Sequence, residues 1–229
     1  MKFTLPLLAF ILSLSAHAQI HYYTPEPAKA EAVNSIITKY TPALIERWKN
    51  EPKVRFIDFN AVQGTASAPL NVPTYDFYSG LFLALEPEEL VLVTCHETGH
   101  LLGTITLRQS DDYIQRNFDL SPESEADYWG GGCVLAHVKE KDLRLSPVDP
   151  RCDVVPAEEQ EHCTYAINLY LTAYPKIFHA SVNPEAAENI VYDRGNGIDF
   201  RYGTPDCRAL TAVHAITGKA RPTCWYNPK

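Results

Sequence analysis

The chain has 229 residues, 45% of them hydrophobic, and a formal net charge of −8 at pH 7. This length suits one large domain with its own hydrophobic core. The sequence is acidic overall and contains no cluster of Lys and Arg residues. Electrostatics therefore disfavours binding to nucleic acid or to an anionic membrane surface.

The first 18 residues are typical of a secretory signal peptide. Lys2 gives a positive start, Phe3 to Ser15 is largely apolar, and small residues at positions 16 and 18 flank the expected cut. The apolar run is too short for a membrane span, and no second run of about 18 apolar residues follows it. We expect a mature chain that begins at Gln19, forms one domain over residues 19–229, and is secreted or periplasmic.

The first half of the mature chain predicts one helix and two strands. Apolar residues spaced mostly three and four apart predict an amphipathic helix from Ala28 to Lys49, interrupted near Pro42. The apolar residues at 54–57 predict a strand, and a loop containing Gly, Ser and Pro follows through Pro73. The aromatic and apolar stretch from Phe77 to Leu85 predicts a second strand.

Four further segments are predicted to be helical. One begins near Pro87, where proline and two acids suit the positive helix end, and stops at Gly103, which offers a left-handed cap. The next begins at Ser121-Pro122-Glu123 and is weakened by the glycines at 130–132. The last two are expected at 156–174 and 205–216. The predicted fold class is therefore α+β, a mostly helical single domain with a small sheet.

Six cysteines form an even set in a chain expected to leave the cytosol, which favours disulfides over free thiols. Fifteen pairings are possible. Short sequence separations favour Cys152–Cys163 and Cys207–Cys224, which leaves Cys95 for Cys133. A zinc site made of these cysteines is less favoured, because none of them falls in a Cys-x-x-Cys pair.

The most informative segment is His96-Glu97-Thr98-Gly99-His100. On a helix, histidines four residues apart share one face, so both imidazoles can reach a single metal ion. Glu97 stands beside them, where it can take a proton from a metal-activated water. The motif is short, so its meaning depends on whether further ligands follow.

A catalytic zinc usually has three protein ligands and one open position. Glu123 and Asp127 lie one helical turn apart in the next predicted helix, as required if one carboxylate binds the metal and the other orients a ligand histidine. The sequence favours Glu123 as the third ligand, with Glu125 as the alternative. The alternative is that these residues bind no metal. The acids would then simply stabilise the start of a helix, and the histidines would lie at the edge of the core.

The two motifs together resemble the gluzincin metallopeptidases, most closely the family containing HtpX, the CAAX prenyl endopeptidases and their soluble periplasmic relatives. The resemblance covers Pro87 to Val134 and little else. It implies a minimal zincin core with one Zn²⁺ held by His96, His100 and Glu123. It also implies that Glu97 is the catalytic base, that Asp127 supports a ligand histidine, and that the strand before the motif, 77–85, receives substrate as an added strand.

The chain departs from these relatives in two respects. The loop between its motifs is shorter, and the His-Pro pair that often precedes an arginine-bearing helix is replaced by Thr204-Pro205. The missing histidine can stabilise the anionic transition state in relatives. Five residues could replace it as an oxyanion donor: Tyr202, Tyr128, His179, His214 and Arg208.

We therefore expect a secreted or periplasmic zinc metalloendopeptidase that hydrolyses peptide bonds of a protein or peptide substrate with a metal-activated water. The main alternative is a catalytically inactive, zinc-binding pseudopeptidase that serves as a protein- or peptide-binding scaffold in the cell envelope. A third is an envelope protein stabilised by disulfides, with a purely structural metal. Glu97 favours the enzyme, because a structural site needs no base and usually fills all four positions with protein ligands.

Overall fold

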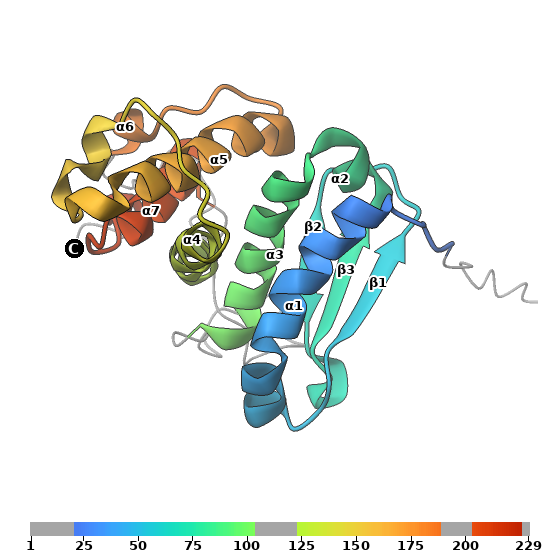
Figure 1. The fold of residues 1–229 in the computed structure, drawn as a ribbon. Helices are drawn as coiled ribbons and strands as arrows, with labels where there is room; N and C mark the ends of the chain where they lie inside the picture. Colours follow the sequence, from blue (N-terminus) through green and yellow to red (C-terminus); the bar gives the residue numbers. More distant parts are fainter. Residues whose placement is uncertain (1–20, 104–122, 189–202, 226–229) are drawn as a thin grey trace, which may run out of the picture.

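The computed structural model describes residues 21–103, 123–188 and 203–225 (Figure 1). The predicted signal peptide, its cleavage site and the predicted helix start at Ser121 lie outside the described residues. The predicted fold class is confirmed: the domain is α+β, mostly helical, with one three-stranded sheet.

Helix α1, Pro27–Trp48, confirms the first predicted helix. One face of it is buried, because its apolar residues recur at helical spacing and pack into the core. The buried residues of this face are Val33, Ile36, Ile37, Leu44 and Trp48. Pro42 lies within the helix without ending it, so the expected interruption at that position is wrong.

The sheet contains β1 (Lys53–Ile57), β2 (Gly64–Ser67) and β3 (Thr74–Tyr78) in the order β1-β3-β2. Strand β1 is parallel to the central strand β3, and β2 is antiparallel to it. Strand β2 lies in the region expected to be a loop.

The predicted strand from Phe77 to Leu85 is wrong in its second half. The chain leaves β3 after Tyr78 and forms helix α2, Ser79–Ala84. Leu81 and Leu85 are both buried at a spacing of four, which suits a helix. A short apolar run does not distinguish a strand from a buried helix, and here the tertiary packing favours the helix.

Helix α3, Pro87–Leu102, contains the His-Glu-Thr-Gly-His motif. It begins with a capping box, in which the side chains of Glu86 and Glu89 each accept a backbone N–H of the other residue. It ends at Gly103. The φ angle of this glycine is −57°, so the left-handed cap expected from the sequence is wrong. Helix α4, Glu123–Glu140, follows in the next described segment.

The C-terminal half is helical. It contains α5 (Gln160–Phe178), α6 (Pro184–Ala187) and α7 (Pro205–Ile216), and the described part also has short 3-10 helices at Pro69–Asn71, Pro150–Val154, Ala157–Glu159 and Thr223–Trp225. In Figure 1, α1 and α3 lie over the sheet, and α4 to α7 gather on the other side of α3. Helix α3 therefore lies between the half that contains the sheet and the half that contains α4 to α7.

The three favoured disulfides are confirmed: Cys95–Cys133, Cys152–Cys163 and Cys207–Cys224. The first joins α3 to α4, and the third joins α7 to the 3-10 helix at 223–225. Three disulfides are typical of an extracellular or periplasmic protein. Among the described helices, none has both the length and the apolar character needed to cross a membrane.

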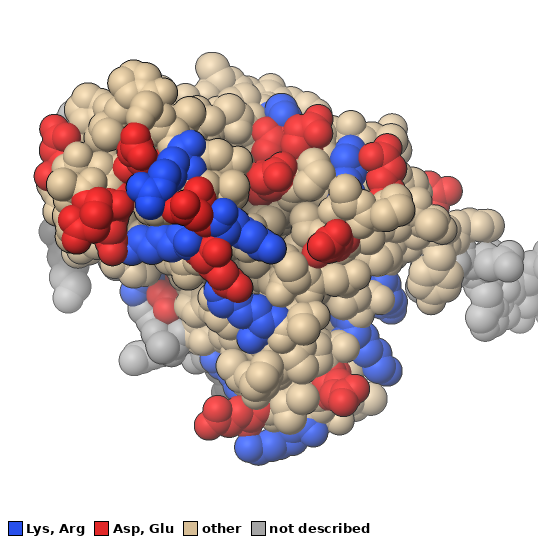
Figure 2. Space-filling view, in the orientation of Figure 1, with Lys and Arg blue, Asp and Glu red and all other residues tan. Residues whose placement is uncertain are grey.

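The face shown in Figure 2 carries Lys and Arg side chains next to Asp and Glu side chains. Ion pairs between exposed groups include Lys39–Glu140 and Lys139–Glu159, each at 2.6 Å. Such surface pairs contribute little to stability. On the face drawn in Figure 2, acidic side chains lie between the basic ones, so no extended basic area forms there.

Candidate metal centre

Two imidazoles and a carboxylate meet on one side of α3. The Nε2 atoms of His96 and His100 are 3.1 Å apart, as expected for residues four apart on a helix. Ligand atoms of His96, Glu97 and His100 all lie within 4.8 Å of one another, and His96 and Glu97 are buried. This cluster could hold a metal ion.

The first turn of α4 brings Glu123 to the two histidines. One carboxylate oxygen, Oε2, lies 3.2 Å from Nε2 of His96, and Oε1 lies 3.5 Å from Nε2 of His100. Glu125, the alternative ligand, instead forms an ion pair with Arg221 at 3.0 Å. Of the two acids, Glu123 is therefore the one beside the histidines.

Asp127 lies one turn further along α4 and is fully buried. Its Oδ1 is 2.8 Å from Nδ1 of His96, so that nitrogen donates its proton to the carboxylate. The hydroxyl of Tyr174 on α5 donates to the same oxygen at 3.1 Å. Holding Nδ1 in this way fixes the ring and directs Nε2 of His96 toward Glu123 and His100.

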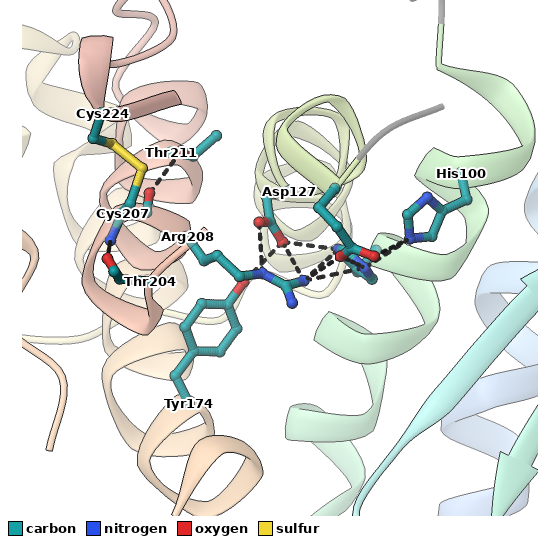
Figure 3. A network of polar contacts seen from close by, with 10 residues as sticks. His100, Asp127, Tyr174, Thr204, Cys207, Arg208, Thr211 and Cys224 are labelled. Atoms are coloured by element: carbon teal, nitrogen blue, oxygen red, sulfur yellow. Dashed lines mark hydrogen bonds and ion pairs between the residues drawn. A yellow bond between two sulfur atoms is a disulfide. The ribbon is translucent and has the colours of Figure 1, made fainter. Parts of the chain in front are cut away.

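Arg208 on α7 ties these carboxylates together (Figure 3). Its Nε donates to Oδ2 of Asp127 at 2.8 Å and its Nη2 to Oδ1 at 3.0 Å, a two-point contact with a carboxylate. The same Nη2 is 2.9 Å from Oε2 of Glu123 and 3.2 Å from Nε2 of His96. The guanidinium group therefore stands directly beside the cluster.

The start of α7 explains how the chain positions Arg208. Thr204 caps the helix by accepting the N–H of Cys207, and Pro205 occupies the first helical position. The Cys207–Cys224 disulfide anchors the same turn, and Figure 3 shows Arg208 leaving it toward Asp127. Thr204 and Pro205 thus begin the helical turn that brings Arg208 to Asp127.

The charges of the cluster shift several pKa values. Burial disfavours the charged form of His96, but the carboxylates of Asp127 and Glu123 outweigh it and raise the pKa of His96 to about 10. Burial raises the pKa of Glu97, which its histidine neighbours only partly oppose. Burial acts the same way on Glu123, yet Arg208 and the imidazoles hold the pKa of Glu123 well below its usual value. The carboxylates thus favour the protonated form of His96, and a metal that binds Nε2 must displace a proton from it.

Small residues let the helices approach closely enough to assemble this cluster. A Cβ on Gly99 would come within 2.7 Å of the backbone oxygen of Ala126 on α4. One on Gly131 would come within 2.7 Å of the backbone oxygen of Ala212 on α7. Gly99 on α3 and Gly131, one of the glycines expected to weaken α4, therefore set the distance of α4 from α3 and α7.

A cavity of about 280 Å³ opens onto the cluster. It is lined by Val62, Gln63, Gly64, Leu81, Leu92, Val93, His96, Glu97, Glu123, Tyr174, Ile177, Phe178 and Arg208. The sequence did not indicate the contributions from β2 and α5. The apolar residues of α5 have the spacing of any core-facing helix, so no local signal distinguishes Tyr174, Ile177 and Phe178 from ordinary packing residues.

Of the five predicted oxyanion donors, Arg208 lines the cavity. The hydroxyl of Tyr128 donates to the backbone oxygen of Lys219, and Nδ1 of His214 lies 2.6 Å from the backbone oxygen of Ala220. His179 is an exposed residue at the C-terminal end of α5. Tyr202 lies outside the described residues.

Comparisons of the chain with protein-family models, with curated proteins and with solved structures find no match. The geometry of the cluster and its cavity therefore carries the functional argument.

Proposed function

We propose that the protein is a zinc-dependent peptidase of the gluzincin type, with His96, His100 and Glu123 as metal ligands. The observation that carries this proposal is the convergence of two imidazole nitrogens and one carboxylate at separations of 3.1, 3.2 and 3.5 Å. Tetrahedral zinc with bonds of about 2.0 to 2.1 Å keeps its ligands about 3.3 Å apart. The donor set thus suits this ion in chemistry and in spacing.

The surroundings of the ligands support a catalytic rather than a structural site. Three protein ligands leave one position of a tetrahedral ion free, and a cavity lined by His96, Glu97 and Glu123 adjoins the proposed ligands. A zinc ion at such a position polarises a carbonyl group and lowers the pKa of a water molecule. Asp127 supports His96 in the manner of the carboxylate partners found behind metal-binding histidines.

Glu97 is the residue proposed to move the proton. It lines the cavity next to His96 and is buried, and its raised pKa brings it closer to neutrality than an exposed glutamate. A base of this kind takes a proton from the attacking water and returns it to the departing amine. Among the predicted donors that the structure describes, Arg208 is the one that lines the cavity, so it is the residue proposed to stabilise the developing negative charge.

Strand β2 is the proposed docking edge for an extended substrate. The central strand β3 pairs on both sides, so the predicted role of residues 77–85 as an added-strand acceptor is wrong. The N–H of Tyr78 donates to the backbone oxygen of Gln63, and hydrogen-bonded pairs alternate along an antiparallel ladder. The backbone groups of Gly64 and Ala66 are therefore directed away from β3, toward an edge that none of the described strands pairs with.

A zinc-binding scaffold without hydrolytic activity is the second candidate. One observation favours it: the His-Pro histidine, which can stabilise the transition state in relatives, is replaced by Thr204. Nη2 of Arg208 also lies 3.2 Å from Nε2 of His96, and a cation this close lowers the affinity of either candidate for zinc unless the guanidinium moves.

The deciding experiment compares wild type with Glu97→Gln and His96→Ala, using the oxidised protein, measured zinc content and casein-derived peptides as substrate. Wild type should bind about one zinc ion and cleave peptides in a chelator-sensitive manner. Glu97→Gln should keep the zinc and lose about 100-fold or more in rate, the typical contribution of a general base. His96→Ala should lose the metal.

Two results would overturn the peptidase assignment. Zinc-loaded wild type that cleaves no peptide would leave the scaffold as the better account. Unchanged cleavage by Glu97→Gln would exclude this residue as the base.

A further inference from the structure

The cavity beside the cluster is apolar over most of its wall. Six of its lining residues carry aliphatic or aromatic side chains without a polar group: Val62, Leu81, Leu92, Val93, Ile177 and Phe178. They come from the segment before β2, from α2, from α3 and from the last turns of α5. Ligand pockets in proteins have this composition, with a few polar groups that fix orientation.

The apolar wall lies about one helical turn from Glu97. Leu92 and Val93 precede His96 and Glu97 by four residues on α3, so they stand about 6 Å toward the start of the helix. An extended chain advances about 3.3 Å per residue. A polypeptide whose cleaved bond lies at Glu97 therefore has a side chain at the apolar wall within one or two residues of that bond.

Gly64 lets the start of β2 lie close to the same part of α3. Gly64 is buried, and a Cβ there would lie 3.2 Å from Val93 and 3.4 Å from Cγ of Glu97. The start of β2 therefore packs directly against the residues of α3 that line the cavity beside Glu97.

We infer that the cavity selects extended polypeptides carrying a bulky apolar residue, such as Leu, Ile, Met or Phe, next to the cleaved bond. The inference rests on the proposed peptidase function and names its substrate class. Charged side chains are disfavoured at this position, because the apolar wall offers them no partner and removes them from water. Gly and Ala fill too little of the cavity to gain from it.

The test is cleavage of a mixed peptide library by the zinc-loaded, oxidised protein, with the cut sites read by mass spectrometry. Wild type should favour bulky apolar residues next to the cut by about 10-fold or more over Ala, since a single methylene in such a pocket changes specificity by about that factor. Ile177→Asp and Val62→Asp place a carboxylate in the half-buried part of the wall. Each should reduce that preference to near unity while zinc content stays the same.

The matched control is Leu83→Asp. Leu83 is 72% exposed on α2 and lies outside the cavity lining, so its substitution should leave the cleavage profile unchanged. Loss of the preference in this variant as well would assign the effect to general destabilisation and overturn the cavity assignment.

The remaining outcomes separate the two proposals. Cleavage by wild type with no apolar preference would overturn the inference and leave the peptidase proposal intact. If no peptide is cleaved, binding of fluorescent Leu-rich and Glu-rich peptides to wild type decides. Tighter binding of the Leu-rich peptide that is lost in Ile177→Asp would support the cavity assignment without hydrolysis, and equal binding of both peptides would overturn it.

Discussion

Helices α3 and α4 supply the two halves of the cluster, but they reach their positions by different means. Helix α3 is buried along most of its length between α1, β2 and α4, and its two histidines are brought together by helical spacing alone. Helix α4 reaches α3 through Gly99, contacts α7 through Gly131, and is joined to its neighbours by a disulfide and by Arg208. The histidine half of the site is therefore a local property, whereas the carboxylate half depends on tertiary contacts.

This difference can be tested by removing the contacts of α4 one at a time. Loss of a contact should change the positions of the Glu123 and Asp127 carboxylates. It should leave the spacing of the two histidines on α3 unchanged. The expected effects decrease in the order given below.

Removal of the arginine should have the largest effect. Arg208→Met leaves two buried carboxylates without their cation, and breaking such a pair costs on the order of 3 to 5 kcal/mol. Urea unfolding of the metal-free protein should show this loss in the free energy of unfolding. Added zinc should recover part of it, because an ion that binds only the folded state stabilises that state.

Lys39→Met is the control for this loss. Lys39 pairs with Glu140 at an exposed position, so its substitution should cost less than about 1 kcal/mol. A loss of the same size in both variants would mean that Arg208 is no more than a surface cation.

Next in size is the disulfide between the two helices. Replacing Cys95 and Cys133 by alanine opens a loop of sequence separation 38, which should cost about 4 kcal/mol by chain entropy. Replacing Cys152 and Cys163, with separation 11, should cost about 3 kcal/mol. Zinc affinity, measured by competition with a chelator, should fall clearly more in the first variant, since only that bond joins α3 to α4. Equal affinities would contradict the dependence of the carboxylate half on this link.

The close contact at Gly99 should rank third. Gly99→Ala puts a methyl group 2.7 Å from the backbone of α4, and such overpacking should cost about 2 kcal/mol and weaken zinc binding. Gly132→Ala is the matched control, because a Cβ there meets no atom within 4 Å. Alanine at that helical position should raise the free energy of unfolding by about 0.5 to 1 kcal/mol. Thermal unfolding should therefore show a lower melting temperature for Gly99→Ala and a higher one for Gly132→Ala. Shifts of both melting temperatures in the same direction would contradict this interpretation.

Two neighbouring tyrosines provide the smallest test. Tyr174→Phe removes a hydrogen bond to the charged Asp127 and should cost about 1.5 kcal/mol. Among the described residues, the buried hydroxyl of Tyr170 has no hydrogen-bond partner, so Tyr170→Phe should be neutral or slightly stabilising. Chemical denaturation of the two single variants measures the difference, and an equal loss would point to a partner for Tyr170.

Local patterns were sufficient for much of the fold. Helical spacing predicted α1 within one residue at each end, and Pro205 to Ile216 matches α7. Short separations in sequence predicted Cys152–Cys163 and Cys207–Cys224, and Cys95–Cys133 was the remaining pair. Strand β2 was missed because Gly-Thr-Ala-Ser has little apolar character, and its strand conformation comes from pairing with β3.

The same distinction applies to the candidate site. Spacing alone predicted that His96 and His100 would face one point, and the two-carboxylate pattern favoured Glu123 over Glu125. No local pattern could show that Arg208, 81 residues after Asp127, would reach that carboxylate, or that Tyr174 would support it. These contacts depend on how α5 and α7 pack against α4, which spacing within one helix does not encode.

The backbone contact at Gly99 also restricts how the motif can vary. A side chain at this position would enter the backbone of α4 at Ala126, so the fourth residue of His-Glu-Thr-Gly-His is constrained by the neighbouring helix. In a search for proteins built on the same plan, a His-Glu-x-x-His match with a bulky fourth residue should therefore be rejected. A small residue there, followed downstream by Glu-x-x-Ala-Asp, would be the more selective pattern.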